Sequence, residues 1–403
     1  MSSSDGAAGG FRGLPRAFWV LVAGMFVNRL GAFVLPFLAL YLSEQQKLGA
    51  RESGLIIGAW GVGAVIAAVV GGQLTDRWGR KRTMLASLCG GAVVLFAFAQ
   101  ASGALTLGAL ALLLGAVAEI YRPAVSAAIT DLTSPDDRGR AFGYLIWSYN
   151  IGFAISPVLA GAIAKHLGFV WLFYGDAATM LAAALVVAVW VPETRPAQTE
   201  TKREHGGLAR ALGDRRLQPL LVAALMLGLA IVQVLAAFGP LMRADGIDIE
   251  QYGRIVSLNG LGIALTQPWI VPRAEKLGAA RVIPLCALVF CWGLGLHAFV
   301  DTPRTHILAI LVWTAGEVAL FPLCNALVSN IAPVELRGRY QGLYFTAWAC
   351  SNVFGPPLGQ ELLAEWGPAG WSLLPFTCGV VASAALWTAT RRAQSTSATL
   401  DRG

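Results

Sequence analysis

The sequence predicts an all-α integral membrane protein with twelve transmembrane helices in two pseudo-symmetric six-helix halves. Three observations predict it. The 403 residues are 56% hydrophobic and only 13% charged, whereas soluble domains carry about 25% charged residues. Apolar runs long enough to cross a bilayer follow one another through short connections. The second half of the chain also repeats features of the first at a fixed offset.

The apolar runs are expected to be helices because no segment alternates polar and apolar residues as a barrel strand does. A helix also satisfies its own backbone hydrogen bonds in lipid. The first run is too long for a signal-peptide core, so it is expected to be a retained helix. In order, the predicted helices are 17–43, 53–75, 82–101, 104–128, 139–163, 168–191, 217–243, 251–271, 280–299, 305–330, 338–363 and 370–390.

The predicted organisation has five parts. An N-terminal tail (1–16) precedes the first half (17–191), and a polar linker (192–216), poor in apolar residues, leads to the second half (217–390) and a C-terminal tail (391–403). With both termini in the cytoplasm, twenty-two Lys and Arg residues lie inside and six outside. Cytoplasmic loops accumulate positive residues, so the sequence predicts this orientation in a plasma (inner) membrane.

Several function classes are excluded by what the sequence lacks. The six cysteines all fall in apolar runs without a metal-ligand spacing, and no Ser/His/Asp constellation, Walker loop or dinucleotide-binding pattern occurs. We therefore expect no enzyme, no catalytic residues, no metal and no cofactor. The net charge of +7 reflects membrane orientation, so nucleic acid is not an expected partner.

The halves repeat at an offset of 199 residues. This offset places Arg337-Gly338-Arg339 on Arg138-Gly139-Arg140 and Pro356 on Pro157. Parallel halves related by an axis along the membrane normal place a substrate between them, near the midplane.

A charged loop after the second predicted helix carries the most specific motif. It reads Gly72-x3-Asp76-Arg77-x-Gly79-Arg80-Lys81. A positive-inside cluster alone explains the basic residues but not Asp76 or the two glycines. With the twelve-helix repeat, this loop resembles the signature of the major facilitator superfamily of secondary transporters, and the resemblance covers nearly the whole chain.

The resemblance implies a cytoplasmic latch. In that family the acidic residue of the loop, here Asp76, meets the start of helix 11, near Arg337 to Gly342. Arg77 and Arg80 need acidic partners, and Asp131 at the inner end of helix 4 is the candidate. Pro272 to Gly278 is a weaker second-half copy of the loop.

Charged and polar residues at membrane depth are candidates for the substrate and proton pathway, because ionisable groups are costly in hydrocarbon. The resemblance implies that helices 1, 4, 7 and 10 line the central cavity. Glu119 and Arg122 are spaced i,i+3 and could instead neutralise each other. Glu317 has no basic neighbour on its own helix and is the favoured proton carrier. The candidates are Arg29, Glu119, Arg122, Gln233 and Glu317.

The direction of transport is read from two helices. Arg29-Leu30-Gly31-x4-Pro36 resembles the first helix of proton-coupled drug exporters. The fifth helix keeps part of the antiporter glycine pattern, although Ala160 replaces a glycine and Ala111 stands where the family has a helix 4 arginine. The expected close-packing residues are Gly152, Pro157 and Gly161 with their second-half counterparts Gly355 and Pro356.

These features predict a proton-driven antiporter that exports small hydrophobic or cationic compounds, of multidrug type, by alternating access. Its expected partners are a small-molecule substrate, protons and the lipid bilayer, and we expect it to function as a monomer. Two alternatives stand beside this prediction. One is a proton-coupled importer with the same fold, and the other is a sensor that transports nothing.

Overall fold

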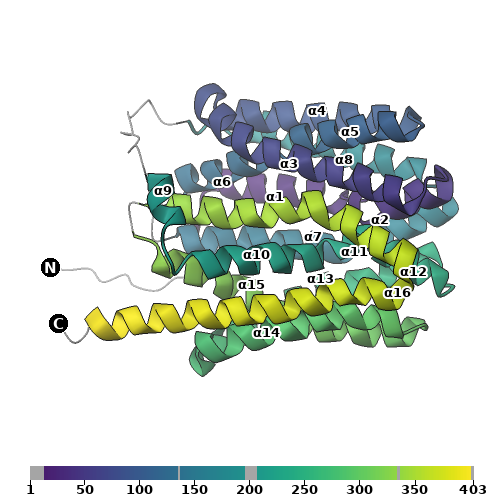
Figure 1. Ribbon diagram of the computed structural model, residues 1–403. Coiled ribbons are helices and arrows are strands. Elements are labelled where there is room, and N and C mark those ends of the chain that lie inside the picture. The colour runs from purple at the N-terminus through teal and green to yellow at the C-terminus, as the bar shows by residue number, and fades with distance from the viewer. Residues whose placement is uncertain (1–12, 135–136, 196–206, 334–335, 401–403) are drawn as a thin grey trace.

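The computed structural model describes residues 13–134, 137–195, 207–333 and 336–400, and this part of the chain forms helices without strands. The helices lie side by side along one common axis (Figure 1). The first half contains α1 (Arg16–Leu30), α2 (Val34–Leu40), the π-helical turn η2 (Tyr41–Gln45), α3 (Ala50–Trp78), α4 (Arg80–Gln100), α5 (Ala104–Ala118), α6 (Tyr121–Leu132), α7 (Arg138–His166) and α8 (Val170–Trp190).

The second half follows a short linker helix, α9 (Gly207–Leu212). Its elements are α10 (Gln218–Ile231), α11 (Gln233–Ala236), α12 (Phe238–Ala244), α13 (Ile249–Leu277), α14 (Ala279–Gly295), the 3-10 turn η3 (Leu296–Phe299), α15 (Pro303–Ile331) and α16 (Arg337–Leu400).

Eleven helical stretches of the described chain are long and apolar enough to cross a membrane. The last of them, Arg339–Ala393, has 55 residues. At about 1.5 Å per residue it is more than twice as long as a bilayer core is thick. Gly367 interrupts it with φ 67° and ψ −169°, and Figure 1 shows α16 reaching one end of the bundle and turning back. The all-helical membrane fold is therefore confirmed, and α16 supplies two crossings, which brings the total in the described chain to twelve.

Prolines divide some crossings into shorter helices. Pro123 has no N–H to donate to the carbonyl of Glu119, four residues earlier, and the fourth crossing breaks there between α5 and α6. Pro240 likewise leaves the carbonyl of Ala236 free at the junction of α11 and α12, and the Gln360 side chain of α16 donates to it instead. The broken helices thus keep their backbone groups paired in a region without water.

Backbone conformation repeats between the halves at the same offset as the sequence. Positive φ occurs at Lys47 and Gly246, at Gly79 and Gly278, and at Gly168 and Gly367. The members of each pair are 199 residues apart. Left-handed φ is the conformation that favours glycine, and these three pairs of turns share it, whereas Gly103, with φ 83°, corresponds to Thr302, with φ −118°. The two halves are therefore structural repeats of one another.

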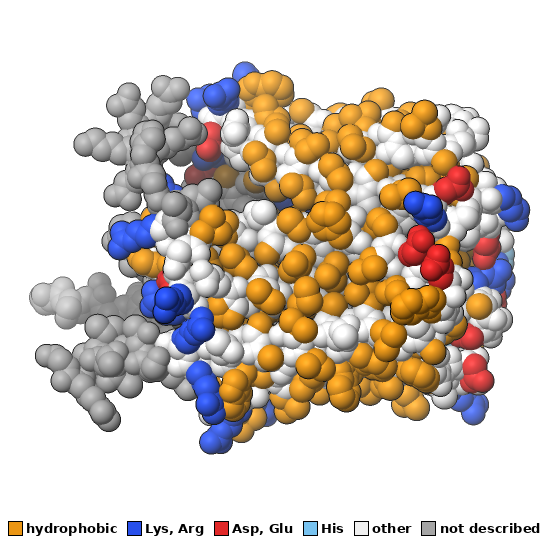
Figure 2. All heavy atoms as spheres, viewed as in Figure 1, with side chains coloured by type: hydrophobic (Ala, Val, Ile, Leu, Met, Phe, Trp, Pro, Cys, Tyr) orange, Lys and Arg blue, Asp and Glu red, His pale blue; other side chains and the backbone are white. Residues whose placement is uncertain are grey.

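The outer surface suits a bilayer. Figure 2 shows hydrophobic side chains over the middle of the bundle and charged side chains gathered at its two ends. Residues such as Val69, Leu105 and Trp269 are largely exposed on the helices, where lipid covers them. We name the end with the Gly72–Lys81 loop and α9 the inner end and the opposite one the outer end.

Candidate functional site

The two halves meet along two seams, α7 with α13 and α3 with α16. Glycines bring the backbones together there. A Cβ at Gly54 of α3 would lie 3.0 Å from the carbonyl oxygen of Pro356, and one at Gly253 of α13 would overlap the carbonyl of Pro157. Gly54 and Gly253 are 199 residues apart, as are Pro157 and Pro356, so the two seams are copies of one contact.

Polar contacts tie the halves together at the outer end. Lys165 of α7 lies 2.8 Å from Glu250 and 3.5 Å from Asp248. Arg243 of α12 pairs with Glu44 at 2.5 Å. Backbone N–H donation from Gln251, with the charge of Lys165, holds the pKa of Asp248 below its usual range. Asp248 is therefore ionised near neutral pH, and these contacts hold the two halves together at the outer end.

The seams separate toward the inner end. A Cβ added at Gly72 of α3, Gly143 of α7 or Gly342 of α16 would meet no atom within 4 Å. A cavity of about 880 Å³ lies beside this part of α7. Because the helices are in contact at the outer end and apart at the inner end, the structure is open to the inner side.

The large cavity has a mostly apolar wall with a few polar groups. It is lined by residues of α7, α13 and α15: Arg140, Gly143, Tyr144, Ile146, Trp147, Asn150, Ile263, Gln267, Pro268, Val271, Pro272, Glu317, Phe321, Pro322 and Asn325. Its volume lies within the range of small-molecule sites, which combine apolar walls with a few orienting polar groups.

Glu317 is the only carboxylate among the residues that line this cavity. Its Oε2 accepts a hydrogen bond of 2.6 Å from Asn259, whose Nδ2 also lies 3.1 Å from the Thr314 hydroxyl. No ion pair to Glu317 occurs within the described residues. Glu317 thus lies in a largely apolar wall, and its hydrogen-bond partner is the neutral amide of Asn259, while Arg140 lines the same cavity.

Arg29 and Arg122 line a second cavity of about 370 Å³, which shares Ile146 and Asn150 with the first. Arg122 pairs with Glu119 at 2.7 Å, the same-helix neutralisation that the i,i+3 spacing allows. The guanidinium of Arg29 lies 5.7 Å from the ring centre of Phe153, within reach of a cation–π attraction. Glu119 itself faces a small pocket inside the first half, together with Arg29 and Asp176.

Gln233 does not lie where the sequence predicted. It is fully buried within the second half. Its Nε2 donates to the carbonyl of Gly355 at 3.0 Å, and its Oε1 accepts from the Trp371 indole at 3.2 Å. Its polar groups tie α11 to α16, and it is not among the residues that line the large cavity.

The lining helices also differ from the expectation. The large cavity is lined by α7, α13 and α15, the fifth, eighth and tenth crossings, and of the expected set (crossings 1, 4, 7 and 10) only the tenth contributes. The first and fourth crossings reach the smaller cavity through Arg29 and Arg122. The reason is the separation of α7 from α13, which places the empty space at that seam.

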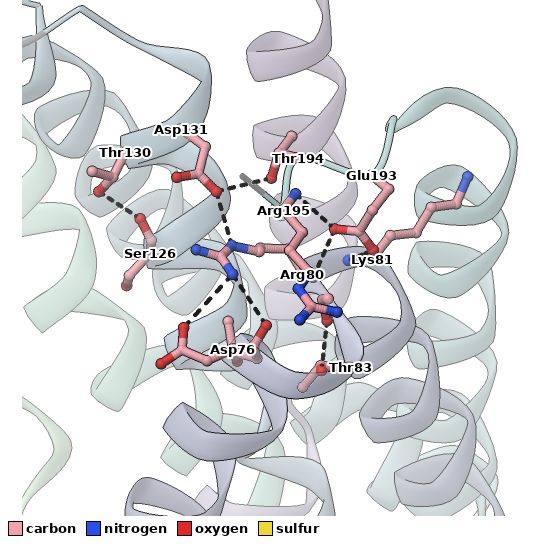
Figure 3. A network of polar contacts seen from close by, with 12 residues as sticks. Asp76, Arg80, Lys81, Thr83, Ser126, Thr130, Asp131, Glu193, Thr194 and Arg195 are labelled. Atoms are coloured by element: carbon pink, nitrogen blue, oxygen red, sulfur yellow. Dashed lines mark hydrogen bonds and ion pairs between the residues drawn. The ribbon is translucent and has the colours of Figure 1, made fainter. Parts of the chain in front are cut away.

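The charged motif was predicted as a loop, but in the structure Gly72–Trp78 is the end of α3, Arg80 begins α4, and only Gly79 lies between them. This segment, which we continue to call the charged loop, forms a network with α6 and the end of α8 (Figure 3). The Nε of Arg80 donates to Asp131 at 2.8 Å and its Nη1 to the Thr75 carbonyl at 3.2 Å. Lys81 donates to the carbonyl of Ala188 at 2.7 Å. Arg80 and Asp131 are thus partners, and α3, α4 and α6 are held together within the first half.

Glu193 completes this network and was missed by the sequence reasoning. Its carboxylate accepts from the backbone N–H groups of Arg80 at 2.8 Å and Lys81 at 3.2 Å. Gly79, with φ 102°, leaves no room for a Cβ beside this carboxylate. An anion at a helix N-terminus satisfies free N–H groups and the helix dipole. The feature of the sequence that could have pointed to Glu193 was a single carboxylate directly after the sixth crossing, two residues from Arg195.

Asp76 does not hold the halves together in this state. Its side chain is 76% exposed, and its ion pair within the described residues is to Arg80 of the same loop, at 3.6 Å. Arg77 is also exposed, and its carbonyl accepts from Arg195 at 2.8 Å. The side chain of Arg337, where the latch was expected, lies outside the described part.

The five predicted packing residues all lie at close helix contacts. A Cβ at Gly161 would lie 2.9 Å from the Ile249 carbonyl oxygen across the α7–α13 seam. A Cβ at Gly152 would lie 2.8 Å from Cγ of Arg29 on α1, and Gly355 lies against Val232, between α10 and α11. Pro157 and Pro356 supply the carbonyls at the two seams.

Removing the Glu193 carboxylate is expected to destabilise the first half. Glu193→Ala leaves two N–H groups of α4 without their acceptor, which typically costs about 1 kcal/mol for a lost cap. Thermal unfolding of purified protein measures the effect as a lower melting temperature. Glu193→Gln, which keeps one acceptor oxygen, should lower the melting temperature less. Glu365→Ala, on the exposed face of α16, should leave it unchanged. Equal melting temperatures for all three variants would contradict the capping role.

A bundle of two repeated six-crossing halves, closed at one end around a cavity that opens at the other, is the architecture of a secondary membrane transporter. A sequence profile of the Major Facilitator Superfamily matches residues 21–249 and 234–401. The chain belongs to the Major Facilitator Superfamily and is a multi-pass membrane transporter.

Curated relatives agree with this family. The chain is 26% identical over 363 residues to the uncharacterized MFS-type transporter YqjV of Bacillus subtilis, covering 87% of each protein. It is 24% identical to multidrug resistance protein 2 of Bacillus subtilis, covering 86% of this chain and 88% of that protein. It is 26% identical to multidrug resistance protein MdtG of Yersinia enterocolitica, covering 85% of this chain and 87% of that protein.

Solved structures share the fold. A crystal structure of the nucleoside transporter NupG superposes with a TM-score of 0.77 at 16% identity, covering 93% of this chain and 98% of that one. The peptide transporter POT in complex with sulfate gives a TM-score of 0.76 at 18% identity, covering 95% and 96%. At these identities the likeness concerns the fold alone.

Proposed function

We propose that the protein exports small hydrophobic or cationic compounds across the plasma membrane in exchange for protons. Both termini would lie in the cytoplasm, so the inner end of the bundle faces the cytoplasm. One chain contains both halves and the cavity between them, which supports function as a monomer. The relatives named multidrug resistance proteins support this substrate class.

The observation that carries the proposal is the placement of Glu317. It is the one carboxylate of a lining that contains Tyr144, Trp147, Phe321 and aliphatic residues, together with Arg140 and three amide side chains. Such a wall binds apolar or aromatic molecules, and the carboxylate attracts a cation to the same place. A proton and a cationic substrate then compete for Glu317, and this competition is the physical basis of antiport.

The two halves would rock relative to one another at the two seams. In the present state the halves touch at the outer end through Lys165, Glu250, Arg243 and Glu44. Closure of the inner end brings Gly72 and Gly143 toward the opposite half and opens the outer contacts. A proton binds Glu317 from the outside, the halves rock, and loss of this proton to the cytoplasm leaves a carboxylate ready for the next substrate.

The charged loop would act as the inner latch in the other state. Because Asp76 is exposed here, Asp76→Asn should leave the inward-open state intact and weaken the outward-open one. Distance measurements between spin labels on the inner ends of α3 and α16 should show fewer closed molecules in the variant. An unchanged distribution, with unchanged transport, would show that Asp76 is not a latch.

Proteoliposomes with an imposed pH gradient test the direction. With an acidic lumen, the membrane potential clamped by potassium and valinomycin, and ethidium as a permanently charged probe, antiport predicts accumulation of ethidium in the lumen while protons leave. Collapse of the gradient by nigericin should abolish it. Movement of the probe in the same direction as protons would favour the importer. No flux of any probe from folded protein would favour a sensor.

A further inference from the structure

A groove runs along the surface of the second half, between α14 and the part of α16 that follows Gly367. These two helices lie side by side (Figure 1). The groove has a volume of about 470 Å³ and shares no residue with the large cavity. Its rim includes the exposed side chains of Trp292 and Trp387. Exposed apolar residues on a membrane helix face lipid, so the groove opens to the hydrocarbon of the bilayer.

The wall on α14 is a single stripe of the helix, and an arginine stands at its inner end. Pro284, Leu288 and Trp292 line the groove at spacings of four residues, which places them on one face of α14. Arg281 lies three residues before Pro284, in the first turn of α14, and so belongs to the same face. The positive end of the helix dipole adds to the charge of this arginine.

The wall on α16 also ends in an arginine. Ser383, Ala384 and Trp387 line the groove, and Arg391 follows Trp387 by four residues. The guanidinium of Arg391 lies 4.2 Å from the centre of the Trp387 ring, a cation–π contact that holds the charge beside the groove. Neither Arg281 nor Arg391 forms an ion pair with an acid of the described chain. The inner mouth of the groove therefore carries two positive charges.

The groove is about as long as one leaflet is thick. From Pro284 to Trp292 it follows eight residues of helix, which is about 12 Å at about 1.5 Å per residue. The hydrocarbon core of one leaflet is about 15 Å thick, half of about 30 Å. An acyl chain from the leaflet at the inner end, the inner leaflet, matches this length. A transmembrane helix of a second copy would instead need a groove along the whole core.

We propose that this groove binds an anionic phospholipid of the inner leaflet. One acyl chain would lie between Leu288 and Ala384, and the phosphate would contact the guanidinium groups of Arg281 and Arg391. A guanidinium matches the geometry of a phosphate, and a basic mouth beside an apolar groove favours anionic headgroups over zwitterionic ones. The inference does not depend on the proposed export, because the groove lies outside the large cavity and both seams.

Lipid retention by the purified protein tests the site without transport. Phosphatidylglycerol and phosphatidylcholine with identical acyl chains are added in equal amounts to protein in detergent, and native mass spectrometry counts the lipids bound per chain. The wild type should retain one phosphatidylglycerol with a preference of about 30-fold, about 5-fold for each arginine. Arg281→Gln/Arg391→Gln should bind the two lipids equally. No preference in the wild type would overturn the proposal.

A control variant separates this site from the general positive charge of the inner end. Arg82, the first-half counterpart of Arg281, lies 199 residues earlier, and both Arg82 and Arg273 are exposed. Arg82→Gln/Arg273→Gln removes the same charge as the first variant, and it should keep the preference for phosphatidylglycerol. Equal loss of the preference in both double variants would assign it to net charge and overturn the site.

A third variant tests the groove itself. Ala384→Phe fills the groove and leaves both arginines in place, so it should remove the retained phosphatidylglycerol. Ala182→Phe, on the exposed face of α8, should not, and unchanged melting temperatures show that both variants fold. Retention by Ala384→Phe would show that the lipid is not held in the groove. A wild-type dimer that dissociates in Ala384→Phe, without any lipid preference, would show that a second copy is the occupant.

Discussion

Glu317→Gln is expected to abolish the coupling of transport to the pH gradient. The amide keeps the size of the side chain and can still bond to Asn259, but it binds neither a proton nor a cation by charge. Gradient-driven uptake of ethidium into proteoliposomes should fall by about tenfold or more, equivalent to about 1.4 kcal/mol or more in the rate-limiting step. Exchange of an uncharged substrate should persist.

Two controls keep this result interpretable. Glu275→Gln changes an exposed carboxylate near the inner end of α13 and should leave transport unchanged. The melting temperature of Glu317→Gln should equal or exceed that of the wild type, because the variant removes a partly buried carboxylate that has no ion-pair partner within the described residues and keeps an acceptor for Asn259. Gradient-driven uptake at the wild-type rate would show that another group carries the proton, and Glu119 is then the next candidate.

Gly253→Ala is expected to reduce transport about as strongly as Glu317→Gln does, because it prevents closure of the outer end. Its methyl group would overlap the carbonyl of Pro157, a backbone atom that cannot rotate away. Overpacking of this kind typically costs about 1–3 kcal/mol, which would shift the conformational equilibrium away from the inward-open state by about 5- to 150-fold. Spin-label distances across the outer α7–α13 contact should lengthen.

A matched glycine provides the comparison. Gly108 lies on α5, where a Cβ would meet only Ile56, at an ordinary contact distance of 3.9 Å. Gly108→Ala should leave both transport and the distances unchanged. If Gly253→Ala kept the wild-type outer distance and full transport, the close α7–α13 contact would not be what closes the outer end.

The features that the sequence predicted correctly depend on local composition and spacing. Lipid requires long apolar runs, so the helices from α3 to α8 were identifiable within a few residues. Turn geometry requires glycine at positive φ, so Gly79 and Gly278 marked corresponding turns of the two halves. The offset of 199 residues followed from the repeated Arg-Gly-Arg at 138–140 and 337–339 and from the matched prolines.

The features that the sequence did not predict depend on how the helices face one another. Gln233 was a plausible pathway residue because an amide in an apolar run has two uses, lining a cavity or tying helices together. In the structure, its hydrogen bonds to Gly355 and Trp371 tie helices together. Glu193 gave no spacing signal, because the N–H groups that it caps lie 113 and 112 residues earlier.

The most direct test of the account measures protons released when substrate binds. Ethidium is added to purified wild-type protein in weakly buffered detergent solutions over a pH series, and a pH indicator reports the change. If a cation displaces the proton of Glu317, about one proton per protein is released in the acidic part of the series, and Glu317→Gln releases none. Equal release from both proteins, or proton uptake on binding, would contradict exchange at Glu317.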